Sequence, residues 1–375
     1  MFMGSTLLTP LYALYAERFA FSQIVLTLVY AAYVVGNLAA LLLFGRVSDH
    51  IGRRRTAWPA ILVAIAGTLA FLFARSLAWL FVGRAVSGLA IGIATAAGTA
   101  WLAELEPPEH RARAALVATT ANFIGIAAGP IVAGLLAQYA PAPLRLSYLV
   151  YLFVLAATAL VVVLAPEPVM ERDGRFSMHP RIGVARAIRP AFVSPAVAAF
   201  CTFAFIGFYA ALAPSLLAQK LHQTNHAVGG AVVGELFIVA ALANFLARRL
   251  SSRSAMLAGL AVQLPALALL VAADAFASLP LLLVATAVGG MSAALGYRGS
   301  LEVVNAIAPE NRRAETVASY MLACFVGNSL PVIGVALLAA ATASNDIALD
   351  IFAGTVAVLA IIAFLFGQRR VKAIA

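Results

Sequence analysis

Charged side chains are scarce in this sequence. Aspartate, glutamate, lysine and arginine make up 11% of its 375 residues, whereas a soluble globular domain carries about 25%. Apolar residues make up 63%, and apolar runs of about twenty residues, the length that crosses a bilayer, recur from one end of the chain to the other. A water-soluble fold of this length cannot bury so much apolar surface, so the composition excludes a soluble globular protein. Lipid must be the main solvent of this chain.

Cysteine is almost absent as well. The two cysteines, Cys201 and Cys324, lie within apolar runs, where free cysteine behaves as a small hydrophobic residue. A disulfide scaffold and a cysteine-rich metal site are therefore excluded. The sequence also has no P-loop, no HExxH pair, no nucleophile elbow and no sizeable polar domain. We expect no enzymatic activity, no cofactor and no metal, and keep a membrane sensor or enzyme as an alternative.

The apolar runs define a chain of candidate membrane helices. They lie at residues 1–16, 22–44, 56–74, 77–103, 113–138, 144–165, 192–218, 227–247, 254–273, 278–300, 314–341 and 346–367. The pattern predicts an all-α membrane protein with twelve transmembrane helices. The first run is too short as it stands, because at 1.5 Å per residue it reaches about 24 Å against a hydrocarbon core of about 30 Å. We expect this first helix to be short or truncated.

The net charge of +10 is unevenly placed between these segments. With twelve crossings, four basic residues fall on one side of the membrane: Arg18, Arg75, Arg145 and Lys220. Arg84 and Arg298 fall inside segments, and all the other basic residues fall on the opposite side. Lys and Arg accumulate in cytoplasmic loops, so both termini are predicted to be cytoplasmic, in a bacterial inner membrane. This distribution accounts for the charge without a nucleic-acid partner.

An internal repeat divides the chain into two halves. At a spacing of 201 residues, Pro108, Glu109, Arg111 and Pro130 match Pro309, Glu310, Arg312 and Pro331. A repeat of six segments predicts two pseudo-symmetric six-helix bundles with a cavity where they meet, an arrangement that supports alternating access. The predicted bundles are residues 1–165 and 192–367. A basic cytoplasmic linker, 166–191, joins them, and a cytoplasmic tail, 368–375, follows.

The loop after the second segment carries a distinctive glycine, aspartate and arginine pattern. It reads GRVSDHIGRRR, with Gly45, Asp49, Gly52 and Arg53. The glycine permits close helix approach, and the arginines hold the loop in the cytoplasm. The loop resembles motif A of the major facilitator superfamily, at the position where that family has it. The resemblance implies that Asp49 belongs to an ion-pair latch that closes the cytoplasmic side. The alternative is a positive-inside anchor alone.

A single arginine lies within the fourth segment. The stretch LFVGRAVSGLAIGIATA resembles motif B of the same family, with Arg84 as its arginine. Arginine at this depth is costly unless it is paired or hydrated, so Arg84 is predicted to face the protein interior. Gly88 and Gly92 follow at intervals of four and predict close packing against a neighbouring helix. The family resemblance gives Arg84 a part in proton coupling. The alternative is a structural arginine that binds backbone carbonyls.

Two further stretches bear on the direction of transport. GIAAGPIVAG in the fifth segment is similar to motif C, which the family associates with antiporters, and its Gly129 and Pro130 predict a helix bend. GSTLLTPLYA resembles the first-helix motif of the twelve-span drug and proton antiporter branch, with Gly4 and Pro10 in place. Together these resemblances favour export over uptake.

Few acidic residues lie inside the predicted membrane segments, and Glu235 is the foremost. It lies near the middle of the eighth segment, where burial favours the neutral form of a carboxyl, as a reversible proton carrier requires. The alternative is an acid hydrogen-bonded to a neighbour for packing. Glu302 lies four residues after Arg298, so those two are expected to form a local ion pair.

The candidate substrate-binding residues are aromatic and amide side chains in segments that line the cavity in the family. They are Tyr30, Tyr33, Asn122, Phe203, Phe237 and Asn328. Such walls suit an amphipathic organic molecule. The resemblance thus implies a monomeric transporter that moves a small molecule through a lipid bilayer, with export coupled to protons. A proton symporter or a facilitator for metabolite uptake is the alternative.

Overall fold

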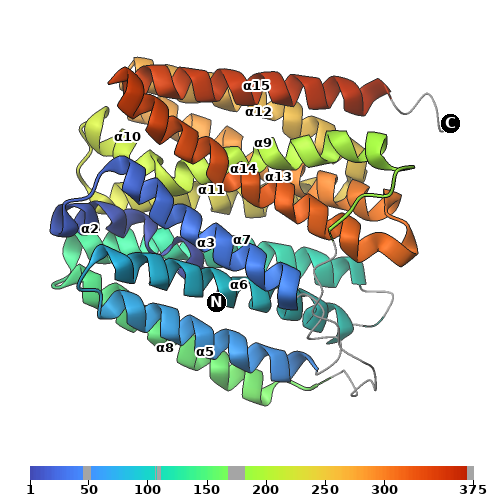
Figure 1. Cartoon of the computed structure of the whole chain (residues 1–375), viewed down its shortest axis with the longest axis horizontal. Helices are drawn as coiled ribbons and strands as arrows, with labels where there is room; N and C mark the ends of the chain where they lie inside the picture. The colour runs from blue at the N-terminus through green and yellow to red at the C-terminus, as the bar shows by residue number, and fades with distance from the viewer. Residues whose placement is uncertain (45–51, 106, 108–110, 168–181, 370–375) are drawn as a thin grey trace. The chain divides into compact units, whose positions relative to one another are not determined.

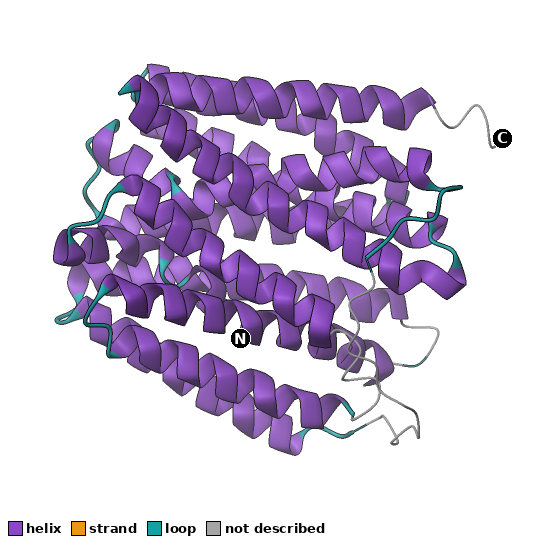
Figure 2. Cartoon of the chain, viewed as in Figure 1, coloured by secondary structure: helices purple, strands orange, loops and turns teal. Residues whose placement is uncertain are grey.

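The structure is a computed structural model that describes residues 1–44, 52–105, 107, 111–167 and 182–369. These residues form helices and loops, and none of them lies in a strand (Figure 2). Eleven helices in this part of the chain are long and apolar enough to cross a membrane. The prediction of an all-α multi-pass protein is confirmed, with eleven continuous candidate spans where twelve were expected.

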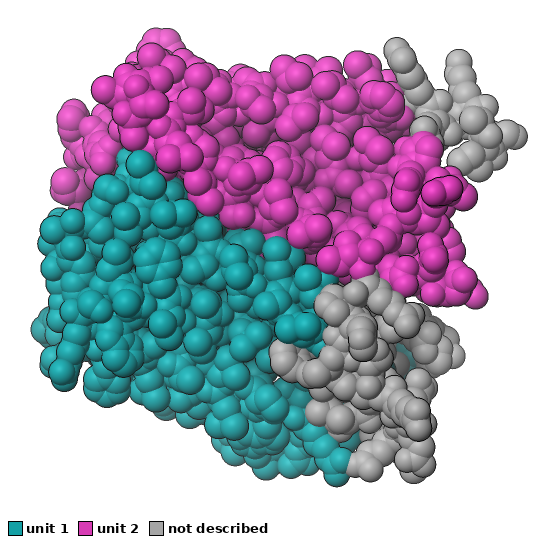
Figure 3. Space-filling view, in the orientation of Figure 1, with its two compact units in different colours: residues 1–180 teal, residues 181–375 magenta. Residues whose placement is uncertain are grey.

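The chain divides into two compact units, residues 1–180 and 181–375 (Figure 3). The helices of unit 1 are α1 (Met3–Thr6), η1 (Thr9–Leu11), α2 (Tyr12–Phe19), α3 (Gln23–Phe44), α5 (Arg53–Leu72), α6 (Leu77–Leu105), α7 (Arg111–Tyr139) and α8 (Pro143–Leu164). Those of unit 2 are α9 (Arg189–Ala211), α10 (Ala213–Gln219), α11 (His226–Leu246), η3 (Ala247–Arg249), α12 (Ser252–Ala275), α13 (Leu279–Ile307), η4 (Glu310–Arg312), α14 (Arg313–Thr342) and α15 (Asn345–Arg369).

The first predicted segment, residues 1–16, is not one helix. It is broken into α1, η1 and the start of α2. Pro10 carries no N–H, so it cannot donate to the carbonyl of Thr6 as an α-helix would require. Leu11 N donates instead to Leu8 O at 3.0 Å, the tighter bond of a 3₁₀ turn. The break explains why this segment lacks the continuous length of the other eleven.

Unit 1 is held together by close helix crossings at glycine. Helix α6 packs against both α3 and α5, and α5 lies beside α8 (Figure 1). A Cβ at Gly88 would overlap Tyr33 O, and a Cβ at Gly36 would overlap Ala85 O. The two backbones are therefore in contact, and the predicted packing face of α6 lies against α3.

Unit 2 uses the same kind of contact. A Cβ at Gly259 on α12 would overlap the backbone of Gly296 on α13, and one at Gly327 on α14 would overlap the backbone of Phe200 on α9. Helix α15 is tied to α9 by the hydroxyl of Ser194, which donates to Ala363 O at 2.8 Å. The hydrophobic effect cannot drive helices together in lipid. Small residues at the crossings allow close van der Waals packing, which stabilises the contact instead.

Candidate functional site

Arg84 lies at the centre of unit 1 with no solvent exposure. Its Nε and Nη2 both donate to the hydroxyl of Tyr12, at 2.8 and 2.5 Å, and its Nη1 donates to Ser5 O at 2.8 Å. Ser5 lies in α1, just before the break between α1 and η1. The predicted inward orientation of Arg84 is confirmed, and its contacts depend on the broken first segment.

Three tyrosine rings surround the guanidinium of Arg84. Its Cζ lies 5.3 Å from the ring centre of Tyr12, 5.7 Å from that of Tyr30 and 5.5 Å from that of Tyr33. Such contacts stabilise a cation without neutralising it. We call Arg84, Tyr12, Tyr30, Tyr33 and the carbonyl of Ser5 the arginine cage. The structure thus brings two predicted substrate residues, Tyr30 and Tyr33, together with the predicted coupling residue.

The charge of Arg84 has no opposite charge beside it. Among the described residues, no carboxylate lies within 4.0 Å of its guanidinium. A neighbouring amide is incompletely satisfied: Asn37 Nδ2 donates to Tyr33 Oη at 3.3 Å, whereas Asn37 Oδ1 has no hydrogen-bond partner in the described part of the chain. The cage is therefore buried and positively charged, and an incompletely satisfied amide lies beside it.

Glu235, the predicted proton carrier, lies on α11 in unit 2. The residue is half-buried, and its Oε2 atom is buried with no hydrogen-bond partner among the described residues. A buried carboxylate oxygen without a donor is costly, so this position tolerates a neutral carboxyl better than an ionised one. The packing alternative needs a hydrogen-bonded neighbour, and among the described residues none is found at Oε2.

The other four predicted substrate residues lie on four different helices. Asn122 on α7 is half-buried, and its Oδ1 lacks a partner within the described ranges. Phe237 on α11 and Asn328 on α14 are buried. Phe203 on α9 is half-buried and meets the ring of Phe325 edge-on at 6.0 Å. Of these four, Asn122 is the residue whose buried polar atom lacks a hydrogen bond within the described ranges.

The predicted latch is described only in part. Gly45 and Asp49 lie outside the described residues. Gly52 precedes α5 with φ +97°, a conformation that favours glycine. Arg53 is nearly buried and binds Glu104 on α6 through two bonds, Nε to Oε2 at 2.8 Å and Nη2 to Oε1 at 2.6 Å. This geometry is the strong, forked form of an ion pair.

A second carboxylate, which the sequence analysis missed, meets the start of α5. Glu167 accepts hydrogen bonds from Arg53 N at 3.1 Å and from Arg54 N at 2.7 Å. A carboxylate at a helix N-terminus binds unsatisfied N–H groups and the positive end of the helix dipole. Glu104 and Glu167 each lie at the end of a predicted apolar segment. An acidic residue at that position is the sequence feature that could have identified both as partners of the start of α5.

Gly129 and Pro130 lie within α7, which continues from Arg111 to Tyr139. A Cβ at Gly129 would overlap Met3 O, so α1 rests directly on α7 there. Thr6 reinforces the contact, since its Oγ1 donates to Ile126 O at 2.6 Å. In this structure Gly129 is needed for close approach by the broken first segment.

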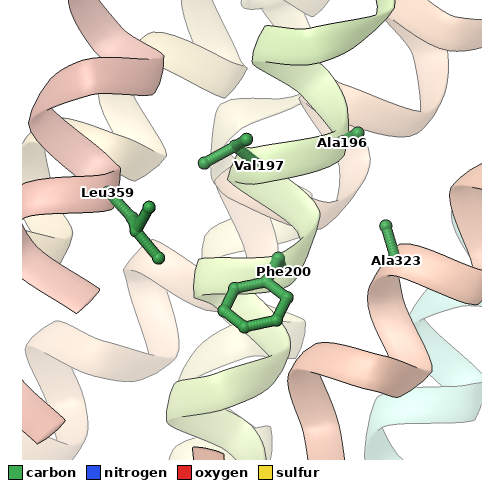
Figure 4. A pocket seen from close by; sticks show the side chains of 5 residues that line it. All are labelled: Ala196, Val197, Phe200, Ala323 and Leu359. Carbon is green, nitrogen blue, oxygen red and sulfur yellow. The ribbon is translucent and has the colours of Figure 1, made fainter. Parts of the chain in front are cut away.

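Unit 2 also contains an apolar cleft of about 310 Å³. Figure 4 shows its lining of Ala196, Val197 and Phe200 from α9, Ala323 from α14 and Leu359 from α15. None of these side chains can hydrogen-bond to or neutralise a polar molecule. A transport site needs a few placed polar groups for orientation, so the arginine cage is the better candidate.

Comparison with known proteins agrees with the helical architecture. The profile of the Major Facilitator Superfamily matches residues 1–330. The chain is 40% identical over 78 residues to the human solute carrier family 2, facilitated glucose transporter member 10, covering 21% of this chain and 14% of that protein. It is 32% identical over 103 residues to the sugar transporter ERD6-like 15 of Arabidopsis thaliana, covering 26% of this chain and 22% of that one.

A solved structure shows the same fold across nearly the whole chain. The human organic anion transporter MFSD10 superposes with a TM-score of 0.69 at 17% identity, covering 98% of this chain and 96% of that one. At this identity the likeness concerns the fold alone. The family profile spans most of the sequence, and the chain therefore belongs to the Major Facilitator Superfamily and is a multi-pass membrane protein.

Proposed function

We propose that this chain exports a small organic molecule in exchange for protons by alternating access. The observation that carries the proposal is Glu235, a carboxyl within a membrane helix whose buried Oε2 has no partner among the described residues. A group in this position can take up a proton on one side and release it when its surroundings change. We also assign Arg84 to the coupling of substrate and proton, because no carboxylate among the described residues lies within 4.0 Å of its buried guanidinium.

The proposed topology has twelve crossings, with the broken segment α1–η1–α2 as the first. The two six-helix halves are residues 1–165 and 192–367, joined by the linker 166–191 and followed by the tail 368–375. The basic loops support a bacterial inner membrane with both termini in the cytoplasm. We propose a monomer, since each unit has its own packed helices.

The latch of the cytoplasmic side is proposed to include Gly45, Asp49, Gly52 and Arg53. The forked pair between Arg53 and Glu104 supports this, because it ties the start of α5 to the far end of α6. Glu167 extends the arrangement to the start of the linker. An anchor that served only to hold arginines in the cytoplasm would need neither carboxylate.

Uptake of a neutral metabolite is the second candidate function. It is favoured by local similarity to sugar transporters, which covers about a quarter of this chain. The matched regions span 22% and 14% of those relatives, so their substrates are not carried over to this chain by similarity alone. A facilitator would work without titration at Glu235, and this separates the two candidates.

The decisive experiment measures proton flux in proteoliposomes with a pH-sensitive dye inside. Gradients of D-glucose, benzenesulfonate and tetraphenylphosphonium supply a neutral, an anionic and a cationic probe. We expect one probe to drive proton movement in the opposite direction, and Glu235→Gln to abolish it. Glu302→Gln is the matched control, because Glu302 forms an ion pair with Arg298 at 2.9 Å. Coupled flux that persists in Glu235→Gln overturns the assignment, and glucose movement without proton flux establishes the facilitator.

A further inference from the structure

We propose that the arginine cage binds the negatively charged group of the transported molecule, so that the substrate is a small organic anion with an apolar or aromatic body. The inference rests on the proposed transport function and names its substrate class. Three separate observations within unit 1 support it.

The first is the uncompensated charge. Arg84 is fully buried, yet within the described part of the chain its partners are a neutral hydroxyl, a backbone carbonyl and three aromatic rings. Arginine at membrane depth is usually paired with an acid or hydrated. A purely structural arginine would be best served by a fixed carboxylate. A site that must bind and release an anion cannot have a fixed carboxylate beside its arginine.

The second is the geometry at the forked edge of the guanidinium. Nε and Nη2 are the two donors with which arginine grips a carboxylate or sulfonate. Here both converge on one oxygen, the hydroxyl of Tyr12. A neutral hydroxyl therefore occupies the place of an anionic oxygen. Exchange of this hydroxyl for an anion replaces one neutral acceptor with an oppositely charged group that can accept both hydrogen bonds in parallel.

The third is the break in the first segment. Discontinuous helices in transporters place helix ends and freed backbone groups at substrate sites. Ser5 O and Pro10 lie at such a break, and Arg84 binds that carbonyl directly. The cage thus lies beside a break in the helix. A movement of α1 away from α7 would change the hydrogen bond between Arg84 and Ser5 O.

The tyrosines set the character of the rest of the ligand. Their rings offer stacking surfaces, while the guanidinium repels any cation. In this structure Tyr12, Tyr30 and Tyr33 close Arg84 off completely, since each of them is itself buried. Binding therefore occurs when the unit opens, with the anion displacing the Tyr12 hydroxyl and its body lying against Tyr30 and Tyr33.

The test compares three small aromatic probes that differ in charge, by equilibrium dialysis against the purified full chain. They are benzenesulfonate, which is anionic at every accessible pH, neutral benzenesulfonamide and cationic benzyltrimethylammonium. We expect saturable binding of benzenesulfonate that is at least about tenfold tighter than that of the other two, as a close charge pair provides. Equal affinity for the amide, tighter binding of the cation, or no saturable binding of benzenesulfonate up to its solubility overturns the inference.

Variants locate the binding. Arg84→Gln should abolish the preference for the anion, and Tyr30→Leu, which keeps the charge, should weaken benzenesulfonate and benzenesulfonamide alike. Arg298→Gln is the matched control, because that arginine already has its carboxylate. Unchanged anion preference in a folded Arg84→Gln overturns the site. If Arg84→Gln does not fold, the comparison of the three probes on the unmodified chain still decides whether the inference holds.

Two outcomes separate this inference from the transport proposal. Charge-selective binding without proton flux contradicts the transport proposal alone, whereas flux of the neutral probe without anion binding contradicts this inference alone.

Discussion

Arg84 in unit 1 and Arg298 in unit 2 both lie away from the ends of long apolar helices, and their surroundings differ. Arg298 on α13 pairs with Glu302 one turn later, Nε to Oε1 at 2.9 Å, and donates to Ala247 O at 2.9 Å and Arg248 O at 3.1 Å. Its side chain keeps 17% of its exposure. Arg84 on α6 is wholly buried and has aromatic rings where Arg298 has an acid.

The difference shows how a membrane protein can hold the same charge for two purposes. Arg298 is neutralised locally and ties η3 to α13, so its chemistry is complete within the protein. Arg84 is stabilised but not neutralised, because cation–π contacts and neutral acceptors leave the net charge in place. Only the second arrangement responds to a negatively charged ligand.

The largest expected effect separates these two arginines. Arg84→Gln leaves the Tyr12 hydroxyl and Ser5 O without donors in the core, and we expect a loss of about 3 kcal/mol in the free energy of unfolding. Arg298→Gln should lose about 1 kcal/mol, because water can reach the groups it leaves. Thermal unfolding of both purified variants in detergent measures this. Equal losses would show that the cage supports the fold no more than a partly exposed ion pair does.

A smaller effect is expected at Arg53, the other buried arginine among the described residues. Glu104→Gln removes one of its charged partners, and because Glu104 is 37% exposed we expect a loss of only about 1 kcal/mol. If the pair belongs to the latch, the variant should also change the reactivity of single cysteines introduced near Phe44 at the end of α3 and near Leu105 at the end of α6. Glu17→Gln, an exposed acid in the same unit, is the control. A change in stability without a change in accessibility would leave Arg53 a structural ion pair.

The long spans were predictable from the sequence because apolar runs of about twenty residues have few other solutions in lipid. Eleven such helices are present among the described residues. The first segment differed because one residue, Pro10, breaks it, and hydropathy averages over such a break. The inward direction of Arg84 was also predictable, since the cost of exposing it to lipid fixes its face.

The partners of these residues were not predictable in the same way. Tyr12 lies 72 residues from Arg84, and Glu104 lies 51 residues from Arg53. Helix periodicity says which face a residue is on, but not which neighbour that face meets. The capping role of Glu167 depends on α8 ending beside the start of α5, and that is a property of the packed unit.

The smallest effect concerns a cation outside the spans. Lys220, after α10, donates to Asp346 Oδ2 at 2.6 Å and lies 4.0 Å from Asp274 Oδ2. The hydrogen bond to Asp346 raises the pKa of Lys220 above its usual 10.5. Folding therefore favours the protonated lysine, so the contribution of this ion pair to stability is complete below pH 10.5 and is lost as the pH rises through the higher pKa of the folded state.

Lys220→Met should slightly lower the unfolding temperature at pH 8, and the difference from the unmodified chain should shrink at pH above 10.5. Arg145→Met, at an exposed arginine, should show no such convergence. A difference that stays constant with pH would assign the effect of Lys220→Met to packing, and Lys220 would then differ from Arg298 in having no useful ion pair.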